Sequence, residues 1–366
     1  MEQNERQLFS LLSEITPLYE APMREAKARQ DALAKPPGSL GLLEDLSVQL
    51  AGITGHIKNE VSHTRIYVLA ADNGVVCEGV SSAPQSVTRA QAINLTRGLT
   101  GASCLAKHFH DGLMVVDMGI ALSYTCPEIL NRSLGKGTAN IAAGPAMTRQ
   151  TAVQGILTGM ELAAQAKRDG IQILGVGEMG IGNTTTSSAV LCALSGEPVE
   201  AVTGRGGGLT GAAFLKKKQV IEQALTINAP DAHDPIDVLH RVGGFDLCAM
   251  TGVFLGAAHD RLPVVVDGFI SVVAALCAAR LRENAGGYFI GSHVSYERGY
   301  EIAAQLLGLK PCLQLGMRLG EGSGCPLAFR VVEAACAVMN TMATFPEAAI
   351  DDGYLTEIRE RDSFTV

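Results

Sequence analysis

The stretch IQILGVGEMGIGNTTTSSAV, residues 171–190, combines a short apolar run, a glycine-rich segment and the start of a predicted helix. An apolar run followed by Gly, Asp, Ser or Glu recurs five times elsewhere in the chain. The six predicted strands are residues 66–71, 113–116, 171–174, 264–266, 288–290 and 312–315. Runs that are apolar throughout are typical of strands in a parallel sheet that helices cover on both faces. The sequence therefore predicts an α/β fold with a mostly parallel sheet flanked by helices, Rossmann-like in type.

The segments between these strands favour helices. Residues 153–166 and 211–225 are rich in Ala, Leu, Gln, Glu and Lys. Residues 1–60 have no buried-strand pattern, and a rigid break, Lys35-Pro-Pro-Gly-Ser39, precedes a predicted helix at 40–50. Residues 327–342 favour another helix. We therefore expect a large α/β catalytic domain at 61–324 and a small helical domain formed by 1–60 and 325–366.

Composition excludes several classes of protein. The chain has 366 residues, 29 Lys and Arg against 37 Asp and Glu, and a formal charge of −8, which argues against nucleic acid or an anionic membrane as the main partner. Its 47% hydrophobic and 18% charged residues are typical of a globular chain. Nine scattered cysteines without a CxxC pair, a polar N-terminus and no long apolar stretch indicate a soluble cytoplasmic protein without a zinc site.

The glycine-rich segment at 175–185 is a candidate phosphate site, because such a segment before a helix presents backbone N–H groups to an anion. It matches GxGxxG at 175, 177 and 180, and it resembles a Walker loop except that Asn183 stands where Lys is required. Glu178 would repel a pyrophosphate but would accept hydrogen bonds from ribose hydroxyls. A ligand with one phosphate and a ribose therefore fits this segment better than a dinucleotide.

Two further segments carry candidate chemistry. Thr203-Gly-Arg-Gly-Gly-Gly-Leu-Thr210 precedes a predicted helix with three lysines at 216–218, of which at most one or two face a site. Gly316-Met-Arg-Leu-Gly-Glu-Gly-Ser-Gly324 places Glu321 between glycines after a buried strand, where a general base approaches a substrate with little hindrance. An exposed turn glutamate would give the same pattern. The histidines show no HExxH pair, so no metal site is predicted.

Six segments, in order along most of the chain, together resemble the nicotinate-nucleotide:dimethylbenzimidazole phosphoribosyltransferase family. They are Lys35-Pro-Pro-Gly-Ser-Leu-Gly41, Ala71-Asp-Asn-Gly-Val75, Pro84-Gln-x-Val-Thr88, residues 175–185, Gly204-Arg-Gly206 and Met317-Arg-Leu-Gly-Glu-Gly322. The resemblance implies a homodimer that transfers the 5-phosphoribosyl group from nicotinate mononucleotide to 5,6-dimethylbenzimidazole in cobalamin biosynthesis. It implies neither a metal nor a cofactor.

The resemblance also implies roles for individual residues. Glu321 is the implied general base, which takes the benzimidazole N–H proton as the other ring nitrogen attacks C1′ of the ribose. The implied contacts to the nucleotide and its phosphate are Glu178, Gly180, Gly182, Asn183, Gly206, Lys217 and Ser295. The implied base-binding residues are Ser82, Pro84, Gln85 and Leu319.

Two other classes of function remain open at this point. A dinucleotide-dependent oxidoreductase would use the glycines at 175, 177 and 180, with Glu197 or Glu200 on the ribose. A non-catalytic nucleotide-binding protein would hold the mononucleotide without turnover. Replacing Glu321 by Gln distinguishes them, because only the transferase needs that carboxylate for turnover.

Overall fold

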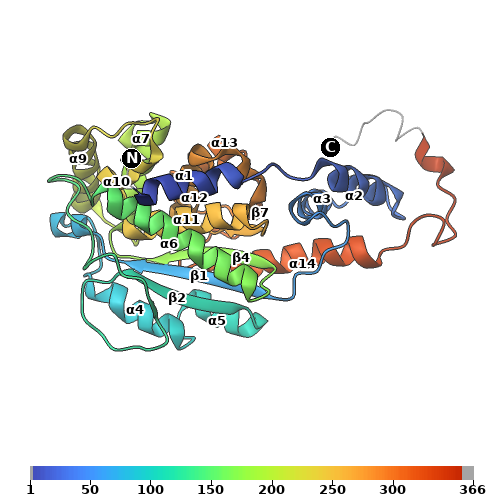
Figure 1. Ribbon diagram of the computed structural model, residues 1–366, viewed down its shortest axis with the longest axis horizontal. Helices are drawn as coiled ribbons and strands as arrows, with labels where there is room; N and C mark the ends of the chain where they lie inside the picture. Colours follow the sequence, from blue (N-terminus) through green and yellow to red (C-terminus); the bar gives the residue numbers. More distant parts are fainter. Residues whose placement is uncertain (1–2, 357–366) are drawn as a thin grey trace. The chain divides into compact units, whose positions relative to one another are not determined.

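The computed structural model describes residues 3–356, and its larger unit contains a seven-stranded sheet (Figure 1). All pairs are parallel, in the order β3-β2-β1-β4-β5-β6-β7. The strands are β1 Thr64–Ala71, β2 Gly112–Gly119, β3 Leu130–Asn131, β4 Ile173–Met179, β5 Val264–Val266, β6 Phe289–His293 and β7 Pro311–Leu313. After β1 the chain adds β2 and β3 on one side of β1, and it then crosses to the other side, where β4 to β7 follow in order. A topological switch point therefore lies between β1 and β4. The expected α/β class with a parallel, helix-flanked sheet is confirmed.

The six predicted strands are present, with two differences. The two-residue strand β3 was not predicted, because Leu130–Asn131 contains no apolar run. Strand β4 continues to Met179, so the first part of the glycine-rich segment is strand and not loop. All seven residues of β4 are buried. Position 177 must be glycine, because a Cβ there would lie 2.6 Å from the backbone carbon of Glu321.

Helices cover both faces of the sheet (Figure 1). The α-helices are α1 Gln3–Glu14, α2 Glu20–Ala32, α3 Leu42–Thr54, α4 Ser86–Thr96, α5 Gly101–Phe109, α6 Arg149–Arg168, α7 Asn183–Ser195, α8 Val199–Val202, α9 Gly211–Asn228, α10 Pro235–Val242, α11 Phe245–His259, α12 Phe269–Leu281, α13 Tyr300–Leu307 and α14 Cys325–Thr341. Helices α4 and α5 lie on one face, and α11 and α12 lie on the other. Helix α6 packs against α11, and α1 packs against α6.

The contact between α6 and α11 is unusually close. A Cβ on Gly159 would lie 2.6 Å from the backbone nitrogen of Val253, and one on Gly252 would lie 2.9 Å from the Cα of Gly159. The two backbones therefore touch where both helices carry glycine. Helix α11 is buried on nearly every side, which explains why it has no polar face in the sequence.

The described part of the chain divides into two compact units, residues 3–16 with 63–328 and residues 17–62 with 329–356. The expected boundaries differ mainly in α1, which groups with the larger unit. Leu8 and Leu12 of α1 are buried, and Glu5 forms an ion pair of 2.8 Å with Arg149 on α6. These contacts give the first helix its place in the larger unit.

The smaller unit contains α2 and α3, and its rigid break is organised by one buried ion pair. Lys35 Nζ lies 2.6 Å from Glu44 Oε1, and both side chains are buried. The amides of Gly38 and Leu40 donate to the same carboxylate at 3.2 and 3.1 Å. A buried carboxylate with a cation and two amide donors is well satisfied, so this pair fixes the turn before α3.

No helix within residues 3–356 is both long and apolar enough to cross a membrane. All nine cysteines are free thiols, and five of them are buried.

Candidate functional site

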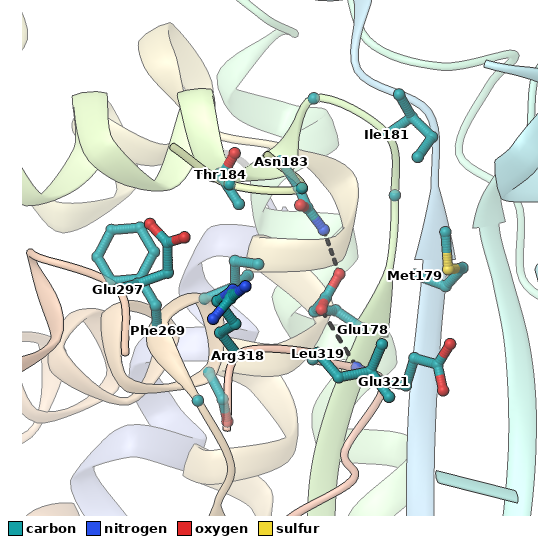
Figure 2. Close-up of a pocket in the computed structure, with 18 of the residues that line it drawn as sticks. Glu178, Met179, Ile181, Asn183, Thr184, Phe269, Glu297, Arg318, Leu319 and Glu321 are labelled. Atoms are coloured by element: carbon teal, nitrogen blue, oxygen red, sulfur yellow. Dashed lines mark hydrogen bonds between the residues drawn. The ribbon is translucent and has the colours of Figure 1, made fainter. Parts of the chain in front are cut away.

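A pocket of about 250 Å³ opens at the carboxyl ends of the strands, beside the switch point. Its wall is built from the segments that follow β1, β4, β5, β6 and β7 (Figure 2). These segments contribute wall residues that fall within 81–91, 178–184, 267–271, 293–297 and 318–321. Gly206 and Gly207, from the loop before α9, complete the wall. Ligands of open parallel sheets bind at this edge, so this is the candidate active site.

Glu178, at the end of β4, is the central acid of the pocket. Its side chain lies between the amide of Asn183 and the backbone of Glu321 (Figure 2). Asn183 Nδ2 donates to Glu178, and it lies 3.3 Å from Asp246 Oδ2, so one amide bridges two carboxylates. Burial raises the pKa of Glu178 to about 8, and burial raises that of Asp246 to about 6. Position 183, where a Walker loop has lysine, is therefore an asparagine whose side-chain amide lies between two buried acids, Glu178 and Asp246.

Glu321 lies on the pocket wall with only 4% of its surface exposed. Its backbone is left-handed, with φ of +61°, in a loop that packs directly on Gly177 of β4. Its Oε2 accepts the N–H of Ala102, in the first turn of α5, at 3.2 Å. The side chain is therefore a buried carboxylate with a fixed position, not an exposed turn glutamate.

Two more titratable groups line the pocket beside Glu321. Asp267 directly follows β5 and is 2% exposed, and burial raises its pKa to about 7. His293, at the end of β6, lies with Nδ1 3.8 Å from Asp267 Oδ1, and burial lowers its pKa. Its ring nitrogen is also 2.9 Å from Ser292 Oγ. His293 is therefore neutral at pH 7, and this corner of the pocket has no protonated histidine.

The other end of the pocket combines a helix N-terminus with a buried lysine. Thr184, in the first turn of α7, lines the wall and accepts a hydrogen bond of 2.9 Å from Lys217 Nζ. Lys217 is fully buried and also reaches the carbonyl of Gly204 at 3.2 Å. Burial lowers its pKa to about 8, although the nearby Glu297 carboxylate acts in the opposite direction. The ammonium thus lies behind the wall and acts on the pocket through the Thr184 hydroxyl.

Glu297 and Arg318 also line the pocket. Arg318 lies over the ring of Tyr296, with 5.9 Å from its guanidinium carbon to the ring centroid. Glu297 and Glu321 lie on opposite sides of Glu178 in Figure 2. Three glutamates are therefore spread across the pocket, in addition to Asp267, and the cations Lys217 and Arg318 both act on Glu297.

The structure places most of the predicted site residues on this one pocket. On the wall are Glu321, Glu178, Gly180, Gly182, Asn183, Gly206, Ser295, Ser82 and Leu319. Lys217 lies behind the wall, and Pro84 and Gln85 are not part of it. Gln85 Nε2 donates to the carbonyl of Asn73 at 3.3 Å, so this side chain supports the segment after β1.

Sequence reasoning assigned no site role to several polar and charged wall residues, among them the five residues Thr184, Asp267, His293, Glu297 and Arg318. Four of them stand in or beside segments that the sequence had already marked, at strand ends or in the glycine loops. Glu297 had no such signal. No group of three or more His, Cys, Asp or Glu is arranged to hold a metal ion within residues 3–356.

The GxGxxG match does not form a dinucleotide loop. Gly175 and Gly177 lie inside β4, and their lack of side chains makes room for Cys325 and for the backbone at 321–322. Only Gly180 lies beyond the strand. The structure therefore gives no support to the dinucleotide alternative, which needs all three glycines around a pyrophosphate.

Comparisons with known proteins agree along nearly the whole chain. A family model described as "Phosphoribosyltransferase" matches residues 15–350. A Clostridium perfringens protein named nicotinate-nucleotide–dimethylbenzimidazole phosphoribosyltransferase is 51% identical over 342 residues, 93% of this chain and 95% of that protein. One of the same name from Ruminiclostridium cellulolyticum is 48% identical, over 90% of this chain and 94% of its own. A crystal structure of the enzyme so named from Thermus thermophilus matches with a TM-score of 0.86 at 38% identity, covering 91% of this chain and 99% of that one.

Proposed function

The chain belongs to the nicotinate-nucleotide–dimethylbenzimidazole phosphoribosyltransferase family, and from this membership we propose that it transfers the 5-phosphoribosyl group of nicotinate mononucleotide to 5,6-dimethylbenzimidazole. The products are α-ribazole 5′-phosphate and nicotinate, an intermediate and a by-product of cobalamin biosynthesis. The observation that carries the proposal is the buried carboxylate of Glu321 in the same pocket as the α7 N-terminus and Glu178.

Glu321 is the general base of the proposed reaction. One benzimidazole nitrogen attacks C1′ and forms the new C–N bond, while the bond from C1′ to the pyridinium nitrogen breaks. The leaving nicotinate keeps that electron pair, and the proton on the other benzimidazole nitrogen passes to Glu321. Proton transfer to a positioned carboxylate contributes roughly a hundred- to ten-thousandfold. The hydrogen bond from Ala102 supports this role, because it fixes where the carboxylate lies.

The nucleotide occupies the end near α7. A phosphate there faces the first turn of α7, Gly206 and the Thr184 hydroxyl that Lys217 supports. Glu178, next to this end, offers oxygens to ribose hydroxyls. The acceptor base then lies at the end formed by Leu319 and Glu321, which supports the assignment of Leu319 to base binding. Ser82 also lines the pocket, but its Oγ donates to the carbonyl of Gly207 at 3.4 Å, next to Gly206.

The experiment incubates the purified protein with nicotinate mononucleotide and 5,6-dimethylbenzimidazole and follows nicotinate and the new nucleotide by chromatography with mass detection. We expect both products only when both substrates are present. Nicotinate release without the base would indicate a hydrolase. Nucleotide binding without turnover would indicate a binding protein.

The Glu321→Gln variant tests the base directly. We expect kcat to fall at least a hundredfold while the dissociation constant of nicotinate mononucleotide changes little, because the substitution keeps the shape and removes the proton acceptor. Glu161→Gln, at an exposed position of α6, is the matched control and should keep full activity. Unchanged turnover of Glu321→Gln would remove this residue from the mechanism.

We also propose a cytoplasmic homodimer whose residues 17–62 and 329–356 act as a small helical domain. Nine free cysteines support a reducing compartment. Tyr296 and Leu315 are 74% and 56% exposed and offer apolar surface to a second copy. Light scattering of the purified chain tests the dimer, and a monomer at micromolar concentration would contradict it.

A further inference from the structure

Asp267 holds the loop that carries Glu321 by its backbone. The Asp267 carboxylate accepts the N–H of Gly322 on Oδ2 at 3.1 Å and the N–H of Gly324 on Oδ1 at 2.7 Å. These amides belong to the residues one and three positions after Glu321. Both carboxylate oxygens are thus engaged by the loop, and the Asp267 side chain is 2% exposed.

The loop needs such support because its backbone is unfavourable. Gly320, Glu321 and Gly322 have φ values of +82°, +61° and +80°, three consecutive residues in the left-handed region. Glycine adopts this region freely, but glutamate does not. The Glu321 N–H has only a long bond, 3.4 Å to Glu178 Oε1, so the two bonds to Asp267 are the shorter attachments of this segment.

The surroundings of Asp267 are built for these amide bonds. A Cβ on Gly324 would lie 2.8 Å from Asp267 Oδ1 and 2.6 Å from Ser292 Oγ, so only glycine lets this amide approach so closely. Ser292 Oγ donates to the backbone carbonyl of Asp267 at 2.9 Å and fixes the aspartate from the other side. The nearest ring, that of His293, is uncharged at neutral pH because burial lowers its pKa. The amides of the loop are therefore the main partners of the Asp267 carboxylate.

We infer that Asp267 is a positioning residue for the transferase reaction, which holds Glu321 in its left-handed, base-competent conformation through the amides of Gly322 and Gly324. The inference rests on the proposed role of Glu321. It assigns Asp267 no contact with the substrate, and its whole effect on turnover passes through the glutamate.

The test is a double-mutant cycle of Asp267→Asn with Glu321→Gln. An asparagine has one acceptor oxygen, so it keeps one loop amide and turns its own N–H₂ toward the other. Because misplacement of a catalytic group by about 1 Å costs roughly a hundredfold, we expect kcat of Asp267→Asn to fall by about that factor. The KM for nicotinate mononucleotide should stay within about threefold. In the Glu321→Gln background, Asp267→Asn should lower kcat less than about twofold.

The matched control is Asp117→Asn. Asp117 is also buried at the end of a strand, β2, and its Oδ1 accepts two backbone amides, of Gly119 and Ile120, at 2.8 Å each. It is not part of the pocket wall. We expect this variant to lose stability by a similar amount and to keep the kcat of the wild type.

Each other outcome overturns the inference. Wild-type kcat in Asp267→Asn would show that the hydrogen bonds from the loop N–H groups to Asp267 do not affect turnover. An equal loss in both backgrounds shows that Asp267 acts independently of Glu321. Wild-type turnover in Glu321→Gln removes Glu321 as the base and, with it, this inference, whereas the transferase activity itself would stand. If Asp267→Asn does not fold, Asp267→Ser replaces it, because the short hydroxyl leaves the amides to water. Failure of both to fold, while Asp117→Asn folds, would show that Asp267 holds the domain and not the loop.

Discussion

Replacing Glu178 by Gln should change how the stability of the protein depends on pH. In the folded protein burial raises the pKa of Glu178 from 4.5 to about 8, whereas in the unfolded chain it returns to its ordinary value. Between these values the folded state holds a proton that the unfolded state has lost. The free energy of unfolding of the wild type therefore falls as pH rises through this window. Glutamine cannot ionise, so the variant lacks this part of the slope.

The size of the effect follows from the two pKa values. Each pKa unit is worth about 1.4 kcal/mol, so full ionisation of Glu178 costs the folded state roughly 5 kcal/mol. This is an upper bound, because water entry and movement of Asn183 relieve part of the cost. We expect the free energy of unfolding of Glu178→Gln, relative to the wild type, to rise by about 2 to 5 kcal/mol between pH 5 and pH 9.

Urea denaturation followed by circular dichroism at pH 5, 6, 7, 8 and 9 measures this difference. Glu161→Gln makes the same chemical change at an exposed site and should show a constant difference from the wild type. Asp246 and Asp267 remain in every variant, so most of their own contribution to the pH dependence cancels in the difference in free energy of unfolding between variant and wild type. Parallel curves for Glu178→Gln and the wild type would refute the reasoning, since they would show that Glu178 is ionised in the folded state with an ordinary pKa.

Two further predictions concern the lysine behind the pocket and the helix contact. Lys217→Met removes the ammonium that bonds Thr184, so we expect the KM for nicotinate mononucleotide to rise at least tenfold in steady-state assays, with thermal stability unchanged or higher; an unaltered KM would contradict the phosphate assignment. Gly159→Val inserts a side chain into the backbone of α11, so urea denaturation should show a loss of about 3 kcal/mol or more, whereas Gly144→Ala, with open space around its Cα, should change stability little.

The sheet could be predicted from the sequence because its strands are buried on both faces. Such strands read as continuous apolar runs, and six of the seven can be located in this way. The carboxyl ends of these strands carry polar residues, so Glu178 and Glu321 could be marked as candidates, but the pattern alone fitted an exposed turn glutamate at 321 equally well, and the role of Glu321 came from the family resemblance. The strand Leu130–Asn131 could not be predicted, since it is a two-residue edge strand whose pairing depends on β2 and not on its own composition.

The exact role of glycine could not be read from spacing. The sequence does not distinguish a glycine needed for a turn from one needed for close packing. In the GxGxxG match, Gly175 and Gly177 are closely packed residues of β4, whereas Gly180 lies beyond the strand. Gly177 lies in a strand, and it is glycine because the loop of Glu321, 144 residues later in the chain, packs on its Cα. Lys217 was likewise indistinguishable from its two neighbours, and only the fold buries that one lysine beside Thr184.

The packing of Gly177 against the Glu321 loop has a mechanical consequence. Glu178 stands next to Gly177, and its Oε1 accepts the Glu321 amide, so the proposed nucleotide-binding acid and the proposed general base are linked through the same contact between β4 and the loop. A shift of β4 by a few tenths of an ångström must therefore move the loop as well, because packed backbones transmit strain. In the proposed mechanism a nucleotide that fills the pocket against Glu178 would thereby constrain the position of the Glu321 carboxylate. This coupling predicts that nucleotide binding orders the Glu321 loop before the base arrives, and slower hydrogen exchange of the amides at 321–324 with nicotinate mononucleotide alone would show it.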